Sequence, residues 1–315
     1  MEKRWQALDE MRGLTMILLT IFFPLSFFDN VPPWLKHSSG NGIYLEDIGA
    51  PVFFFIIGAS YFISFTKKKQ VMSVAKLIFS FLRRYLLFIA LGFIGGMLLD
   101  GKVGIKFHWN VLTAIGLCGI LVLPFMYAGY KVRIAAAIAI TSLWQIFIST
   151  GHQDWALTYA FGGPWATPAW SSIILFGSAI SEIKEKIKSG PLLPILVGTA
   201  IVIFFIGVGA EGYFPDNKHL VSFPYVMISV AISIFALAVF EAKGINGFLR
   251  FPLFSIVGKN PLAIYVISGI ESSLIEKILP ATLSIGLIAV VTAMASLLCI
   301  AASWVMDKKK MYLKI

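Results

Sequence analysis

The chain has few charged residues for its length. Asp, Glu, Lys and Arg together make up 13% of the 315 residues, whereas hydrophobic residues make up 58%. A soluble domain carries about 25% charged and about 45–50% apolar residues. This composition leaves too few polar side chains to cover a water-exposed surface, so it excludes an ordinary soluble protein. We therefore expect the chain to use lipid as its solvent.

Cysteine is also scarce. Cys118 and Cys299 both lie within apolar runs, so the sequence excludes a disulfide framework and a CxxC redox motif. We expect both thiols to pack as small core side chains. The opening residues, MEKRWQALDEMRG, lack the small-residue cleavage site of a removable signal peptide, so we expect a retained first span. No low-complexity tract or internal repeat is visible.

Long apolar runs, separated by charge clusters or Gly/Pro-rich stretches, fill most of the chain. A spanning helix needs about 20 mostly apolar residues, and the runs lack the two-residue alternation of a membrane barrel. The pattern predicts an all-α, polytopic membrane helix bundle, as one integral-membrane domain over residues 1–315, with about ten transmembrane helices. The expected spans are 13–28, 48–66, 77–99, 110–128, 134–150, 168–182, 191–210, 221–240, 252–272 and 281–306.

The basic residues predict the orientation of these spans. With the N-terminus inside, 21 of the 26 Lys and Arg residues fall on the inner side, as the positive-inside rule requires. We therefore expect both termini in the cytoplasm, and a bacterial inner (plasma) membrane as the location. The net charge of +10 comes from basic residues that form short clusters between the apolar runs, which is the pattern of membrane topology. We therefore expect the lipid bilayer as a partner and no nucleic acid.

The histidines all fall in connections on the opposite, outer side. They stand far apart without ligand spacing, so we expect no metal site. They are His37, His108, His152 and His219.

Ionisable groups within or beside spans are costly and by default mark a partner or a function. Asp9 and Arg12 are three residues apart, so they share a helical face and can form an ion pair. Arg83 and Arg84 lie inside the third expected span. Two interpretations of these arginines stay open. They anchor the helix at the membrane surface, or they bind a phosphate group, for which a guanidinium is well suited.

Two further segments carry notable polar residues, one at membrane depth and one in an outer loop. Lys259 and Asn260 stand between Gly258 and Pro261, a pattern that breaks a helix and favours a ligand site over a simple helix start. Asp47 enters the second span at its outer end, where helix capping alone could explain it. His37 and Asn41 precede Asp47 in a Gly-rich outer loop. Lys36, Asn41 and Asp47 nearby strengthen the case for a functional His37, while an ordinary loop histidine stays the alternative.

The segment KHSSGNGIYLEDIGAPVFFFIIGAS resembles the heparan-α-glucosaminide N-acetyltransferase family. The family pattern is Lys-His, Asn-Gly, an Asp five residues later, a Pro, an aromatic run and Gly-x-Ser. The opening LDEMRGLT resembles the Leu-Asp-x-x-Arg-Gly start of the same transmembrane acyltransferase superfamily, and IVGKNPLAIYV resembles its late Gly-x-Asn segment. Gly40 departs from the family pattern, which has Trp there.

The resemblance implies an acetyl-CoA-dependent acyltransferase that moves acetyl from the cytoplasm to an amino sugar or related glycan at the outer side. It implies His37 as the catalytic residue, acting as general base or acetyl carrier, with Asn41 and Asp47 as its polar partners. Arg12, Arg83, Arg84, Lys259 and Asn260 are the candidates for binding acetyl-CoA. N- versus O-acetylation, the acceptor and a homodimer stay open.

Other classes of function remain. A transporter of a small metabolite or lipid would use the same broken helix and buried charges, without consuming acetyl-CoA. A non-catalytic membrane partner would bind no CoA at all.

Overall fold

A computed structural model describes residues 5–100, 109–187, 191–246 and 252–313. Within these residues the chain is all-α, with an isolated bridge between Asn41 and Asn217 as its extended pairing. The helices are α1 (Gln6–Leu25), α2 (Gly49–Lys69), α3 (Val74–Asp100), α4 (Val111–Val122), α5 (Tyr130–Phe147), α6 (Gln153–Leu157), α7 (Thr167–Ile187), α8 (Leu192–Glu211), α9 (Phe223–Asn246), α10 (Pro252–Val257), α11 (Pro261–Ile278) and α12 (Ile285–Lys308).

Each expected span overlaps a helix, which confirms the all-α prediction. In the described part of the chain, six segments are long and apolar enough to cross a membrane. They are residues 46–69, 74–97, 130–157, 192–211, 223–242 and 285–308. The chain is therefore an integral membrane protein. The number of about ten spans and the cytoplasmic termini stay predictions, and His108 lies outside the described residues.

The chain divides into two compact units. Residues 1–39, 44–49 and 235–315 form the first, and residues 40–43 and 50–234 form the second. The expectation of a single domain over the whole chain stays a prediction.

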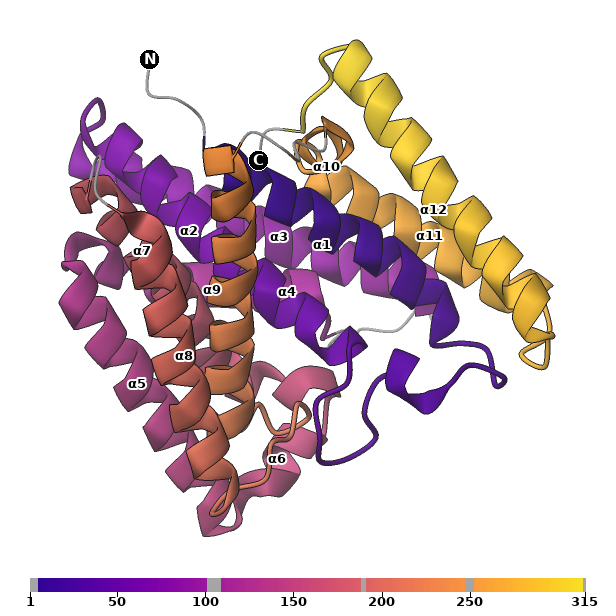
Figure 1. The fold of residues 1–315 in the computed structure, drawn as a ribbon, viewed down its shortest axis with the longest axis horizontal. Helices are drawn as coiled ribbons and strands as arrows, with labels where there is room; N and C mark the ends of the chain where they lie inside the picture. The colour runs from indigo at the N-terminus through magenta and orange to yellow at the C-terminus, as the bar shows by residue number, and fades with distance from the viewer. Residues whose placement is uncertain (1–4, 101–108, 188–190, 247–251, 314–315) are drawn as a thin grey trace. The chain divides into compact units, whose positions relative to one another are not determined.

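In the first unit, α1 packs against α10, α11 and α12 (Figure 1). Two glycines allow the approach of α1 to α10. A Cβ at Gly13 would overlap the backbone carbonyl of Phe254, and a Cβ at Gly258 would overlap that of Asp9. Small residues permit such close backbone approach in membrane proteins, where helices associate by packing. Close packing of α1 against α10 therefore explains why the LDEMRG and IVGKN motifs each contain a glycine.

The predicted break in the ninth span is confirmed. α10 ends at Val257 and α11 begins at Pro261, which occupies the first turn, where a missing backbone N–H costs nothing.

The connection after α1 is hydrogen-bonded to the connection between α11 and α12. The backbone N–H of Asp29 donates to the carbonyl of Ala281 at 2.8 Å, and the Asn30 amide donates to the carbonyl of Leu283 at 2.8 Å. In the same part of the unit, Phe22 and Phe28 pack in an apolar cluster with Ile288 of α12. These contacts position the chain that leads from α1 to His37.

The second unit is built around α7, which packs against α4 and α5. A second glycine pair joins α2 to α7, because a Cβ at Gly58 would overlap the carbonyl of Ile174 and one at Gly177 would overlap that of Phe55. Arg133 of α5 is fully buried and forms an ion pair with Glu182 of α7. A buried charge in an apolar bundle is tolerated when it is paired in this way.

Candidate active site

His37 lies in the first unit, in the connection between α1 and α2. A short turn over Pro33–Leu35 leads into it, and a second short turn over Glu46–Ile48 leads into α2. Asp47 organises the chain between these two turns. Its Oδ2 accepts hydrogen bonds from the backbone N–H of Ser38 at 3.2 Å and of Tyr44 at 2.9 Å. The predicted cap of α2 is thus an anchor for the loop that bears His37.

The imidazole of His37 lies between two carboxylates. Its Nδ1 is 3.0 Å from Oδ1 of Asp47, and its Nε2 is 3.1 Å from Oε1 of Glu46. The Asp47 side chain is fully buried and that of Glu46 is 5% exposed, whereas the His37 ring is 39% exposed. The ring is therefore held on both nitrogens and still presents an open face.

Glu46 was not among the residues that the sequence predicted. The available signal was a second carboxylate beside Asp47 at the start of an apolar span, where an ionisable residue needs a reason. Ser26, at the end of α1, donates to the same Oε1 of Glu46 at 2.7 Å. This bond links the end of α1 to the histidine.

This arrangement limits the protonation states of the site. A neutral imidazole has one N–H, so it cannot donate to two ionised carboxylates. Either the ring is an imidazolium that donates to both carboxylates, or it is neutral and one of the two carboxyl groups is protonated and donates to the other ring nitrogen. In both states a proton lies between Nε2 and Oε1. The site is therefore chemically able to store and exchange a proton at Nε2.

Asn41, the third predicted residue, belongs to the second unit. Its Oδ1 accepts a hydrogen bond from the Asn217 amide at 3.0 Å. The neighbouring Gly42 has a positive φ of 100°, and its N–H donates to Asp216. The Asn-Gly pair thus forms a turn that is attached to the segment before α9.

Three of the candidate CoA-binding residues lie together in the first unit. Arg12 forms the predicted ion pair with Asp9 at 2.8 Å, and the same Nη1 lies 3.3 Å from the carbonyl oxygen of Gly258. This bond joins the LDEMRG and IVGKN motifs. Lys259 forms an ion pair with Asp307 at 2.7 Å. Each of these cations therefore has a carboxylate partner.

Asn260 is buried and forms hydrogen bonds with the C-terminal segment. Its amide donates to the carbonyl of Met311 at 3.0 Å, and its Oδ1 accepts from the N–H of Leu313 at 3.1 Å. Both of these hydrogen bonds hold the backbone of the C-terminal segment against the start of α11.

Arg83 and Arg84 lie on α3 in the second unit. Arg83 is exposed, and the guanidinium of Arg84 lies 5.7 Å from the ring centroid of Tyr85. The Nε of Arg84 is buried without a hydrogen-bond partner. These two arginines differ from Arg12 in having no described carboxylate partner.

Metal ligands do not gather in the part of the chain that the structure describes. No group of three or more His, Cys, Asp or Glu side chains there has the geometry to hold an ion.

Comparison with known families identifies the chain. The model of the heparan-alpha-glucosaminide N-acetyltransferase catalytic domain matches residues 4–190, which is more than half of the sequence. That match includes His37, Glu46, Asp47, Arg83 and Arg84. No curated protein matches the chain. The chain therefore belongs to the heparan-alpha-glucosaminide N-acetyltransferase catalytic family, a family of membrane acetyltransferases that use acetyl-CoA.

Proposed function

We propose that this protein transfers the acetyl group of cytoplasmic acetyl-CoA to the amine of an amino sugar or related glycan at the outer side of the membrane. The observation that carries the proposal is the His37 imidazole, held between the carboxylates of Asp47 and Glu46 with an exposed face. A positioned histidine is the usual group for proton transfer near neutral pH.

The reaction needs a proton acceptor. As the amine attacks the thioester carbonyl, a C–N bond forms, the C–S bond breaks and CoA leaves as a thiolate. The amine loses one proton in this step, and the thiolate gains one. We propose that Nε2 of His37 takes the proton from the amine and returns it to the sulfur. Alternatively, Nε2 attacks the thioester first and carries the acetyl group to the amine.

Glu46 has a role in either route. Because its Oε1 faces Nε2, an incoming substrate has to take the place of Glu46 beside that nitrogen. A Glu46 that leaves with the shared proton exposes the Nε2 lone pair. Asp47 keeps the other proton on Nδ1, which directs the lone pair to Nε2. Glu46 therefore primes the histidine, and Asp47 orients it.

Asn41 is the proposed donor to the oxyanion that develops on the thioester oxygen. Its carbonyl oxygen accepts from Asn217, which sets the direction of its amide.

For CoA we favour Arg83 and Arg84 as the phosphate-binding residues. Phosphates bind best to guanidinium groups that need not give up another partner. Arg12 and Lys259 would have to release Asp9 and Asp307, and Asn260 would have to release the C-terminal backbone. The basic inner side predicted from the Lys and Arg distribution is consistent with a cytoplasmic nucleotide.

The decisive experiment uses the full chain purified into lipid nanodiscs with acetyl-CoA and a panel of amino sugars. Release of CoA thiol and the mass of the acetylated sugar are both measured. We expect turnover in the wild type and at least about a hundredfold loss in His37→Ala, because positioned acid–base groups contribute that much. His152→Ala, in another connection, is the matched control. Near-wild-type turnover in His37→Ala would remove His37 from the mechanism.

A further inference from the structure

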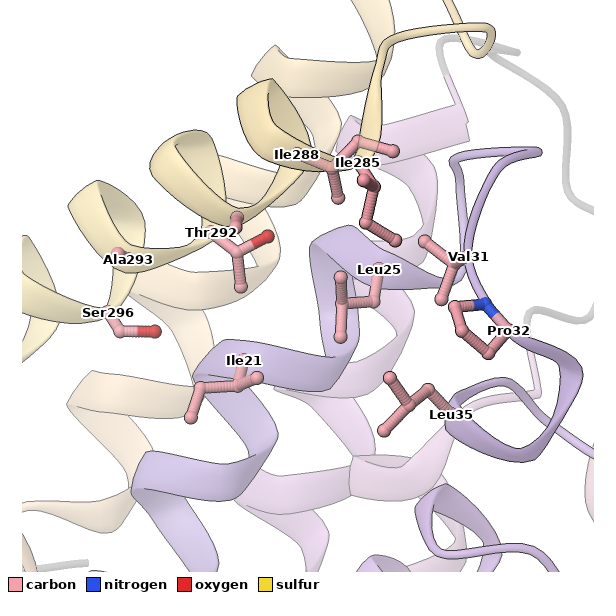
Figure 2. A pocket seen from close by; sticks show the side chains of 11 residues that line it. Ile21, Leu25, Val31, Pro32, Leu35, Ile285, Ile288, Thr292, Ala293 and Ser296 are labelled. Atoms are coloured by element: carbon pink, nitrogen blue, oxygen red, sulfur yellow. The ribbon is translucent and has the colours of Figure 1, made fainter.

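An apolar pocket of about 380 Å³ lies in the first unit, between the end of α1, the connection that follows it and α12. This volume is within the range of sites for small molecules. Figure 2 shows its two sides, with α1 and the following connection facing α12. The residues that matter here are Ile21, Leu25 and Leu35 on one side, and Ile288, Thr292 and Ser296 on the other.

Two polar groups within this lining stand out. Thr292 is 5% exposed and Ser296 is 7% exposed, and neither hydroxyl has a hydrogen-bond partner. They are four residues apart, so they lie on one face of α12 and project toward α1 (Figure 2). Hydroxyls on such helices usually bond to the carbonyl one turn earlier, as Ser303 does to Cys299 on the same helix. Two buried hydroxyls that do not do so call for an acceptor from a bound molecule.

The pocket begins beside the candidate active site. Leu25 in its lining is followed directly by Ser26, which donates to Glu46, and Leu35 stands two residues before His37. On α12 the lining runs from Ile285 to Ser296, which corresponds to about 16 Å of helix. A molecule with its head at His37 can thus extend a chain along α12.

We propose that the acceptor is a membrane-anchored amphiphile: an amino sugar linked to a single lipid chain through an ester or amide. This inference rests on the proposed function and names its substrate class. The sugar lies at His37, the chain occupies the pocket, and the linking carbonyl accepts hydrogen bonds from Thr292 and Ser296. The apolar lining suits the chain, and the two hydroxyls suit a carbonyl at that depth.

The test compares three acceptors in nanodiscs that contain the full chain. They are glucosaminyl monolauroylglycerol, its dodecyl ether analogue without a carbonyl, and methyl glucosaminide. Burial of two methylene groups already corresponds to roughly a tenfold change in binding. We therefore expect the ester to have a KM at least about tenfold below that of methyl glucosaminide, with the ether between them. Equal KM values for all three would overturn the proposal.

Three variants assign the effect to the pocket. Ala289→Phe, which fills the lining on α12, should raise the KM of the ester about tenfold more than that of methyl glucosaminide. Thr292→Val with Ser296→Ala should abolish the preference for ester over ether. Leu297→Phe is the matched control, because Leu297 is 63% exposed on α12 and outside the lining. An unchanged chain preference in Ala289→Phe would contradict the assignment.

A binding measurement separates this inference from the proposed function. The ester acceptor carries a diazirine in its acyl chain, and the labelled peptides are mapped by mass spectrometry. Saturable labelling of residues 285–296, competed by unlabelled ester, supports the pocket even if no acetyl is transferred; absent transfer would then refute the enzymatic role alone. Labelling that does not saturate and is unchanged in Ala289→Phe means that ordinary bilayer lipid fills the pocket, and the proposal fails.

Discussion

Oε1 of Glu46 lies 3.1 Å from Nε2 of His37, on the nitrogen opposite the one that faces Asp47. A histidine with a single carboxylate partner offers its second nitrogen directly to substrate. Here that nitrogen faces the buried carboxylate of Glu46, so under the proposed function a substrate has to displace Glu46 to reach it. The two carboxylates should differ in what they contribute, and their substitutions should separate the contributions.

Glu46→Gln tests proton transfer at Nε2. Glutamine has nearly the same shape and can keep the bond from Ser26, but it cannot accept the proton. We expect kcat for acetyl transfer to fall by about a hundredfold or more, with the thermal unfolding midpoint little changed. CoA release and a thermal melt of the same preparation measure both. Wild-type kcat in Glu46→Gln would show that Glu46 only positions the ring.

Asp47→Asn tests the anchoring of the loop. The carboxylate accepts bonds from His37, Ser38 and Tyr44, and an amide nitrogen in its place would face backbone N–H donors. Losing charge-assisted bonds at a buried position should cost about 3 kcal/mol of unfolding free energy. We expect a lower unfolding midpoint together with a loss of activity. Lost activity with an unchanged midpoint would instead confine Asp47 to the imidazole.

Gly13 and Gly258 test the approach of α1 to α10. A methyl group at either position would overlap a backbone carbonyl, which cannot move aside as a side chain can. We expect Gly13→Ala and Gly258→Ala each to destabilise the protein by about 2 kcal/mol or more. Gly269→Ala on α11 is the control, because no atom lies within 4 Å of its Cβ position. The measurement is the unfolding midpoint of each variant. Equal midpoints for all three variants would contradict the close packing of α1 against α10.

Arg133 and Glu182 test the buried ion pair of the second unit. Glu182→Gln leaves the fully buried guanidinium of Arg133 without a carboxylate, which should cost about 3–5 kcal/mol. The double variant Arg133→Met with Glu182→Leu removes both charges and should recover part of that loss. Lys186→Met is the control, because Lys186 pairs with the same Glu182 but is 58% exposed. A double variant no more stable than Glu182→Gln would argue against the pair.

The helices were predictable because lipid demands an apolar surface along the whole of a spanning segment. The break at Gly258–Asn260 was predictable because Pro261 cannot continue a helix ladder. The ion pair of Asp9 with Arg12 followed from their helical spacing. In contrast, the six described segments that are long and apolar enough to cross a membrane are fewer than the expected spans. The reason is that α4 is short and that α1, α7 and α11 each include charged residues.

The sequence by itself determined that the chain is a membrane protein, that it is helical, and that His37 and Asp47 lie close together. These properties depend on hydrophobicity and on residues close together along the chain. Only the tertiary structure decided that Glu46 covers Nε2, that Arg12 reaches the carbonyl of Gly258, and that Thr292 and Ser296 line a pocket beginning near Leu35. The Glu46 contact depends on side-chain direction within one connection, and the other two depend on helices far apart in sequence; no local pattern encodes either.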